Sequence, residues 1–271
     1  MAAPACNTET QLPVGLSEHH LSSGGIDRRY LIHLPLLRDR RAALPVVFNL
    51  HGSGGTPEGQ LETSRLAPLA DARGVVLVAP AAIDNRWNVP PDASRADDVR
   101  FFSDLIDALS GLLCVDRRHV YSTGFSGGGR MSSQLACDLG DRIAAVAAIG
   151  GVRFPGPCER ARHMPVLAFH GTADPTNPYL GGGQPYWGTG VEDAIAGWAS
   201  HNGCGSRTES RVAPGVDQLS FAGCGAGEVV LYRIDGFGHD WPDVVLPEQR
   251  DATANDILWS FFLAHPLPAA P

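Results

Sequence analysis

Short apolar runs and helical patterns alternate along the chain. Apolar runs typical of buried strands fall at 45–50, 75–79, 119–123, 143–149, 165–170 and 228–234, and residues 26–34 alternate as in an edge strand. Between them lie segments with a helical spacing of apolar residues, at 61–71, 97–113, 127–137, 191–201 and 252–264. Strands that alternate with helices predict an α/β protein: a single, mostly parallel sheet of about seven or eight strands with helices on both faces.

The length of the chain favours one domain. Its 271 residues lie near the upper limit that one hydrophobic core serves, so we predict a single domain over residues 1–271, with 1–20 as an N-terminal extension. A division into two domains stays open. Residues 1–5 have neither the basic nor the apolar region of a signal peptide, so none is expected here. The apolar runs also fall short of the roughly 18 residues of a membrane-spanning helix, so no membrane span is expected.

Charge and composition exclude several chemistries. The formal net charge is −8 and the isoelectric point is about 5.6, without a basic run that could follow a phosphate backbone, which argues against a nucleic-acid partner. All 21 basic residues are Arg. A chain without Lys has no Schiff-base lysine, no lysine-containing phosphate loop and no Ser-Lys dyad.

Six cysteines indicate an oxidising compartment. None of them forms a C-x-x-C pair, which argues against a zinc ribbon or a thioredoxin-type site, and we expect neither metal nor cofactor. We favour three disulfides and a secreted, extracellular or periplasmic protein over six reduced core thiols. Fifteen pairings are possible in principle.

The segment Gly124-Phe-Ser-Gly-Gly128 fits G-x-S-x-G between a predicted strand and a predicted helix. Glycines two positions before and after the serine permit a sharp turn, because a Cβ at either place would clash. Ser126 would stand exposed above the sheet as a nucleophile. A glycine-rich helix start without chemistry is the alternative. We expect Arg130, further along the helix, to lie on the surface.

A nucleophilic serine needs a histidine base and a carboxylate that orients this base. Asp174 directly follows the predicted strand that ends near His170, and His239 follows the last long strand. The carboxyl ends of parallel strands are where open α/β sheets place their sites. The order Ser126, Asp174, His239 is the order found in α/β hydrolases.

Other histidines and carboxylates compete for these roles. We interpret His170 as a structural residue that holds the Asp174 loop. Asp235 is the main alternative acid because it ends the final strand. Asp240 would point away from its neighbour His239, and Asp193 and Asp243 are expected in solvent.

His51-Gly-Ser-Gly-Gly55 closes the strand at 45–50. Glycine-dense backbone lets an amide point into a site, as an oxyanion hole requires. We expect the N–H groups of Ser53 and Gly127 to be the two donors, with the loop position uncertain by one residue. A plain glycine turn is the alternative.

Together these segments, with Gly238-His-Asp-Trp-Pro242, resemble a known family: the secreted serine esterases described as polyhydroxybutyrate depolymerase or feruloyl esterase-like proteins. The similarity extends over about residues 26–262. It implies an α/β-hydrolase fold, with Ser126 as nucleophile, His239 as base and Asp174 as acid. Asp240 and Asp243 depart from the residues that are usual in the family, and these departures leave the catalytic assignment unchanged.

Only about fifteen residues separate the strands at 143–149 and 165–170, where many lipases insert a lid, so we expect no lid domain and an open site. Aromatic rings near the strand ends would contact an aromatic acyl group or a polymer chain. The expected substrate contacts are Trp87, Phe125, Tyr179, Trp187 and Trp241. For Trp87 and Trp241 a place in the roof of the core is an almost equal alternative, whereas Tyr186 and Trp187 are expected to be exposed.

Chain geometry favours one set of cysteine pairs. A strand and a helix of similar length return the chain to the same end of the sheet, which predicts Cys114 with Cys137. Cys204 with Cys224 would close a segment rich in Gly and Ser. Cys6 with Cys158 is left by elimination.

The sequence thus predicts a monomeric, metal-free serine esterase. It would act through an acyl-enzyme on aryl (feruloyl-type) esters or on polyester (hydroxyalkanoate) chains. Acyl transfer or peptidase action by the same triad is a second possibility. A non-catalytic wall-binding protein is a third, against which the intact set of Ser126, Asp174 and His239 argues.

Overall fold

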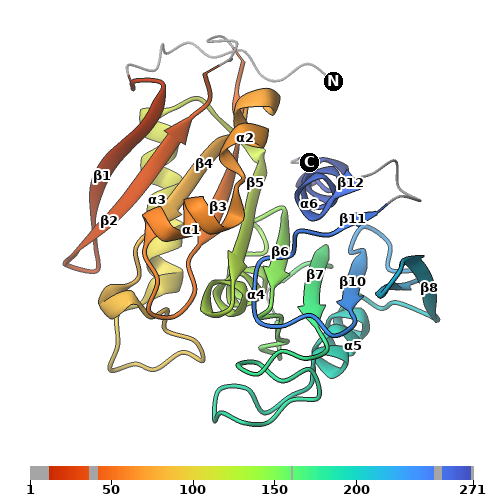
Figure 1. Cartoon of the computed structure of the whole chain (residues 1–271). Helices are drawn as coiled ribbons and strands as arrows, with labels where there is room; N and C mark the ends of the chain where they lie inside the picture. Colours follow the sequence, from red (N-terminus) through yellow and green to blue (C-terminus); the bar gives the residue numbers. More distant parts are fainter. Residues whose placement is uncertain (1–11, 37–41, 160, 247–251, 270–271) are drawn as a thin grey trace.

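A ten-stranded sheet runs through the protein (Figure 1). This computed structural model describes residues 12–36, 42–159, 161–246 and 252–269. Along the sheet the strands follow the order β1-β2-β4-β3-β5-β6-β7-β10-β9-β8. Their bounds are β1 Gly15–Ser23, β2 Ile26–Leu34, β3 Leu44–Leu50, β4 Val76–Pro80, β5 Val115–Phe125, β6 Ala145–Ile149, β7 Val166–Gly171, β8 Arg207–Ala213, β9 Val216–Phe221 and β10 Val229–Ile234. A separate two-stranded ladder pairs β11 (Val245–Leu246) with β12 (Ala252–Thr253).

The six adjacent strands at the centre of the sheet, in the order β4-β3-β5-β6-β7-β10, are parallel to one another. The strands on either side of them pair antiparallel. The central strands are almost wholly apolar because helices cover both of their faces. The predicted α/β class with a mostly parallel sheet is confirmed. Parallel strands also end at one edge of the sheet, and this edge collects the loops described below.

The predicted strand count is wrong because β1, β8 and β9, at the margins of the sheet, were not predicted. β8 exposes most of its side chains, and β1 alternates exposed and half-buried positions. β1 begins at Gly15, so the predicted extension of residues 1–20 is wrong from that residue onward. β2 pairs on both sides and is not the edge strand that its alternation suggested.

Six α-helices and one 3₁₀ turn are found in the described part of the chain. Their bounds are α1 Pro57–Ser64, α2 Ala67–Arg73, η1 Ile83–Asn85, α3 Asp98–Leu112, α4 Gly127–Asp138, α5 Val191–His201 and α6 Ala254–Ala264. The single helix expected at 61–71 is wrong: Arg65 adopts a left-handed conformation that ends α1, and Pro68 opens α2. None of these helices is long and apolar enough to cross a membrane, for the described residues.

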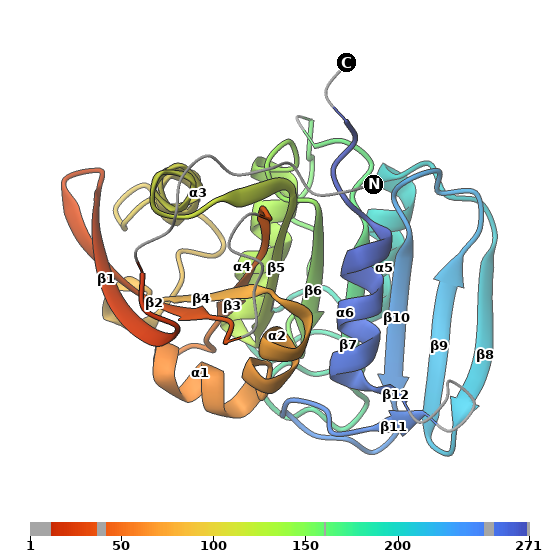
Figure 2. The same cartoon turned by 90° about the horizontal axis from the view of Figure 1, so that it is seen from above.

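Two apolar clusters lie on the two faces of the sheet. Side chains of α3, α4 and α5 pack in one cluster, and those of α2 and α6 pack in the other. Figure 2 shows α3 and α1 on opposite sides of the strands. In the described parts of the connection between β6 and β7, residues 150–159 and 161–165, there is no helix, in agreement with the predicted absence of a lid.

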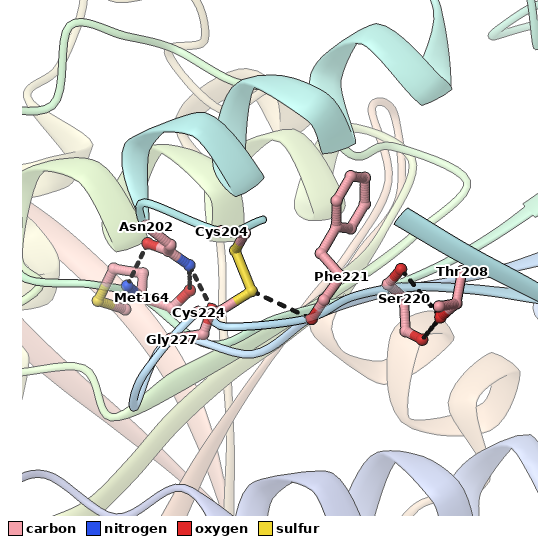
Figure 3. Close-up of a disulfide and its surroundings, with 8 residues drawn as sticks. All are labelled: Met164, Asn202, Cys204, Thr208, Ser220, Phe221, Cys224 and Gly227. Atoms are coloured by element: carbon pink, nitrogen blue, oxygen red, sulfur yellow. Dashed lines mark hydrogen bonds between the residues drawn. A yellow bond between two sulfur atoms is a disulfide. The ribbon is translucent and has the colours of Figure 1, made fainter. Parts of the chain in front are cut away.

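The disulfides confirm one predicted pair and contradict another. Cys204 and Cys224 are bonded, with their Cα atoms 4.1 Å apart, beside the Asn202 side chain that bridges Met164 and Gly227 (Figure 3). Cys137 pairs with Cys158, so the predicted pairs Cys114 with Cys137 and Cys6 with Cys158 are wrong.

Cys114 and Cys137 do not pair because they lie in different layers of the structure. The Cys114 carbonyl accepts a hydrogen bond from Leu44 N–H of β3, which places Cys114 in line with the sheet. Cys137 lies in α4, one layer away, and a disulfide requires two Cα atoms within about 7 Å. Cys114 also takes part in a disulfide, and Cys6 lies outside the described residues.

Candidate active site

Ser126 occupies a sharp turn between the end of β5 and the start of α4. Its backbone has φ 52° and ψ −112°, which a residue with a side chain rarely adopts. The Ser126 N–H donates to the Ile149 carbonyl at 2.8 Å, so the neighbouring strand β6 holds the strained residue in place. The predicted strand, turn and helix around Ser126 are confirmed, whereas its predicted exposure is wrong, because Ser126 is only 6% exposed in the turn.

The two outer glycines of the motif lie where no side chain fits. A Cβ at Gly128 would lie 2.1 Å from the Leu50 carbonyl oxygen, and a Cβ at Gly124 would lie 2.5 Å from the Gly128 carbonyl carbon. Both contacts are with backbone, which cannot rotate away. The glycines therefore let the start of α4 approach β3 and β5 closely.

Replacing Gly128 by Ala is therefore expected to destabilise the protein by about 3 kcal/mol or more, because backbone must shift to admit the methyl group. Gly111→Ala is the matched control. Gly111 lies on α3 with nothing within 4 Å of the position that the added methyl group would take, so this change should be neutral or stabilise by about 0.5 kcal/mol. Urea unfolding of both variants measures the difference, and equal stabilities would contradict the close approach.

Asp174 and His239 come together from the ends of two adjacent parallel strands, β7 and β10. The Nδ1 atom of His239 lies 2.6 Å from Oδ2 of Asp174. The carboxylate is buried, and its Oδ1 accepts hydrogen bonds from the N–H groups of Thr176 and Asn177, each at 2.8 Å. An Nδ1–H that donates to this fixed carboxylate leaves Nε2 of His239 available to accept a proton.

Hydrogen bonds keep Asp174 ionised despite its burial. Burial raises the pKa of Asp174, but hydrogen bonds from His170, His239 and the Asn177 N–H outweigh it and hold the pKa well below its usual range. Asp174 is therefore ionised at neutral pH and faces the His239 ring as a carboxylate.

Two glycines after β6 bring Ser126 and His239 against the same stretch of backbone. A Cβ at Gly151 would lie 2.1 Å from the Ser126 carbonyl oxygen, and a Cβ at Gly150 would lie 3.5 Å from Nδ1 of His239. The Phe125 ring, next to Ser126 in the chain, lies 4.7 Å from the His239 ring between centroids. The three residues predicted as a triad are thus gathered at one place above the sheet.

The competing residues have other partners. Asp235 is exposed and accepts from the Thr172 hydroxyl at 3.2 Å, Asp240 accepts from the Trp241 N–H, and exposed Asp243 pairs with Arg65. Buried His170 lies inside the acid loop, with Nε2 2.9 Å from the Asn177 carbonyl and 3.3 Å from Oδ2 of Asp174. This geometry agrees with the structural role predicted for His170.

The backbone of Ser53 lies against Gly127, the residue that follows Ser126. A Cβ at Gly127 would lie 3.0 Å from the Ser53 nitrogen. Gly54 N–H donates to Asn85 and Gly55 N–H donates to Gly52, whereas the N–H groups of Ser53 and Gly127 have no acceptor among the described residues. The hydrogen bonds thus favour Ser53 over the two residues that follow it.

His51 anchors this loop. Its Nε2 accepts from the Ala82 N–H at 3.1 Å, its carbonyl accepts from the Trp87 indole, and burial lowers the pKa of His51 so that the ring stays neutral.

The predicted aromatic contacts are mostly buried. Trp187 is 2% exposed, so its predicted exposure is wrong: its indole donates to the Pro178 carbonyl and its ring stacks on His170. Trp87 and Trp241 are also buried, with indole N–H groups bonded to His51 and Asn255, and the buried Tyr179 hydroxyl donates to Glu192. Phe125 is half-buried beside His239, and Tyr186 is 36% exposed as predicted.

Sequence reasoning missed two residues of this site. Asn177 bonds Asp174 through its N–H and the Gly150 carbonyl through its side chain. Arg130 is 4% exposed, so the prediction of a surface residue is wrong. Its signal was the helical position four residues after Ser126, because helix side chains lean toward the N-terminus.

No protein-family model matches the chain, but individual known proteins are similar to it in sequence or in fold. Feruloyl esterase B from Piromyces equi is 32% identical over 229 residues, which cover 78% of this chain and 42% of that protein, so the chain spans about two fifths of this relative. The putative esterase NocK from Nocardia uniformis subsp. tsuyamanensis is 31% identical over 255 residues, covering 82% of this chain and 73% of that protein. An acetyl xylan esterase structure from Aspergillus awamori shares the fold, with a TM-score of 0.67 and 14% identity over 92% of this chain and 99% of that one. The chain therefore belongs to the feruloyl esterase-like family of carboxylic ester hydrolases with the α/β-hydrolase fold.

Proposed function

We propose that the protein is a serine esterase that cleaves aryl esters through a covalent acyl-enzyme. The observation that supports this most is the 2.6 Å contact between His239 and Asp174 next to the strained Ser126. A buried carboxylate that fixes the imidazole tautomer makes the other ring nitrogen a base for a serine hydroxyl. The family relationship points to the same chemistry.

In the first step His239 Nε2 accepts the proton of the Ser126 hydroxyl while Oγ attacks the ester carbonyl carbon. The tetrahedral intermediate collapses with transfer of this proton to the departing alcohol, which leaves the acyl group on Ser126. Water then attacks the acyl-enzyme, His239 takes a proton from it, and the acid is released as the proton returns to Ser126. Asp174 stays ionised throughout and stabilises the imidazolium.

The negative charge that develops on the carbonyl oxygen needs donors placed in advance. The N–H groups of Ser53 and Gly127 are suited to this role because they have no acceptor among the described residues and lie close together next to Ser126. The Gly127 N–H is also one of the unpaired N–H groups at the start of helix α4. Removal of one such donor costs about 10²- to 10³-fold in kcat in other hydrolases.

The surroundings of the site favour a flat or short acyl group over a long chain. The half-buried Phe125 ring and the exposed Tyr186 ring are accessible aromatic surfaces of this site, whereas the predicted tryptophan faces are buried in the core. The described residues between β6 and β7 contain no helix that could roof an apolar tunnel. Each CH₂ that stays in water forgoes about 0.8 kcal/mol of transfer free energy.

We therefore expect the purified protein to hydrolyse methyl ferulate and p-nitrophenyl acetate or butyrate faster than p-nitrophenyl palmitate, by at least about tenfold in kcat/KM. Initial rates on these esters, polyhydroxybutyrate and a peptide panel measure the preference. A tenfold preference for the palmitate, with activation at a lipid interface, would contradict the open site. Hydrolysis of the peptides alone would contradict an esterase, and acyl transfer to an added alcohol in place of water would identify a transferase.

The disulfides Cys137–Cys158 and Cys204–Cys224 fit an extracellular protein, because such bonds persist in oxidising compartments. We propose that the enzyme acts outside the cytosol on esters that reach its open site.

A further inference from the structure

Arg130 is a buried cation that has no carboxylate partner in the part of the chain that the structure describes. Its contacts there are two hydrogen bonds to neutral side chains and one aromatic ring, and 4% of the residue is exposed. Burial lowers the pKa of Arg130 to about 10, which leaves the guanidinium charged at neutral pH. Burial of a charge without a counterion destabilises the folded protein. A buried arginine beside Ser126 therefore suggests a functional role that offsets this loss of stability.

The guanidinium joins the two loops that build the site. Nη1 donates to Oδ1 of Asn177 in the acid loop at 3.2 Å, and Nη2 donates to Oγ of Ser53 in the oxyanion loop at 3.2 Å. The ring of Tyr186 covers the guanidinium, with its centroid 4.3 Å from Cζ. Arg130 itself is fixed on α4, where its N–H bonds the Ser126 carbonyl.

Each partner acts on a group of the proposed mechanism. Asn177 donates its N–H to Asp174 at 2.8 Å and its side-chain amide to the Gly150 carbonyl at 2.6 Å. Ser53 supplies one of the two N–H groups that we propose as oxyanion donors. Loss of the guanidinium would therefore loosen both the acid and the oxyanion donor.

The charge also lies close to where the oxyanion forms. A Cβ at Gly127 would lie 3.4 Å from Nη2 of Arg130, so the guanidinium borders the residue that supplies the other N–H. In a partly desolvated site a nearby positive charge stabilises an oxyanion more than a neutral carbonyl. This difference lowers the barrier without tightening the binding of the substrate.

We propose that Arg130 is a positioning residue of the oxyanion hole, which holds Ser53 and Asn177 in place and adds its positive charge to the field at the developing oxyanion. This inference rests on the proposed esterase function.

Arg130→Gln and Arg130→Lys test the inference on methyl ferulate. The Gln variant removes the charge and should lower kcat about 10- to 100-fold while KM changes by less than about threefold. The Lys variant keeps the charge and should recover part of this loss. Phenylboronic acid forms an anionic tetrahedral adduct with a catalytic serine, so the Gln variant should weaken its binding by a similar factor and leave the binding of neutral ferulamide unchanged.

Arg162→Gln is the control for a structural effect, because this half-buried arginine bonds the Gly140 carbonyl, before the start of β6, at the opposite end of the sheet from Ser126. It should lower the melting temperature without changing kcat per folded molecule. Retention of kcat within threefold in Arg130→Gln, or equal losses in Gln and Lys variants, would overturn the inference while the esterase function stands. A wild-type protein that hydrolyses no ester and binds no boronate would overturn both.

Discussion

Replacing Ser126 by Ala is expected to lower kcat for p-nitrophenyl butyrate by at least about 10⁴-fold, with a melting temperature within about 2 °C of the wild type. The triad acts as a unit, so loss of the nucleophile removes covalent catalysis altogether. The fold should persist because the Ser126 N–H, not its hydroxyl, bonds the Ile149 carbonyl. Steady-state rates and thermal melts measure the two effects.

Ser110→Ala provides the matched control. Ser110 is half-buried on α3, where its hydroxyl bonds the Ile106 carbonyl. It lies just before the start of β5, whereas Ser126 follows the opposite end of that strand. Its variant should keep full activity. Mass spectrometry after brief exposure to the ester should find an acyl adduct on the wild type and none on Ser126→Ala. Retention of more than a tenth of the wild-type rate by Ser126→Ala would exclude the acyl-enzyme mechanism.

The sequence predicts the place of the candidate triad well because parallel strands convert order in the chain into position in space. Ser126, Asp174 and His239 each directly follow an apolar run, and such runs end at the same edge of a parallel sheet. The motif glycines add a local constraint, since Gly124 and Gly128 have backbone neighbours where a Cβ would lie. The apolar runs and the motif glycines can both be recognised in short stretches of sequence, without knowledge of how the layers pack.

The predictions that proved wrong concern features that depend on packing between layers. Cys137 lies in helix α4, outside the sheet, and is bonded to Cys158 in the connection between β6 and β7. The lengths of β5 and α4 do not predict this pairing. Trp187 lies in a glycine-rich loop that predicts exposure, yet His170 stacks against its ring and buries it.

The marginal strands and Arg130 show the limit of apolar patterns. β8 is mostly exposed, so its pairing with β9 leaves no apolar signature. Arg130 is charged, and a charge predicts solvent unless the groups that replace water are known. Here those groups, Ser53 and Asn177, lie 77 and 47 residues away in the chain.

Replacing Asp174 by Asn is expected to lower kcat about 10⁴-fold while the protein stays folded at neutral pH. An amide can present its NH₂ group to Nδ1 of His239, which selects the tautomer with the proton on Nε2 and removes the base. The two N–H groups of Thr176 and Asn177 can still bond the amide oxygen, so the loop retains its shape. Steady-state kinetics on p-nitrophenyl butyrate measures the loss.

Asp235→Asn is the matched control, because Asp235 is the exposed alternative acid just after β10, and this variant should retain full activity.

The depressed pKa of Asp174 adds a second measurement, the dependence of stability on pH. The carboxylate contributes stability that is present above its unfolded pKa of about 3.9 and is lost as pH falls toward the lower folded value. The stability of the wild type relative to Asp174→Asn should therefore fall between pH 5 and pH 2 in thermal melts. A full loss of activity in Asp235→Asn, with activity kept in Asp174→Asn, would transfer the role of acid to Asp235.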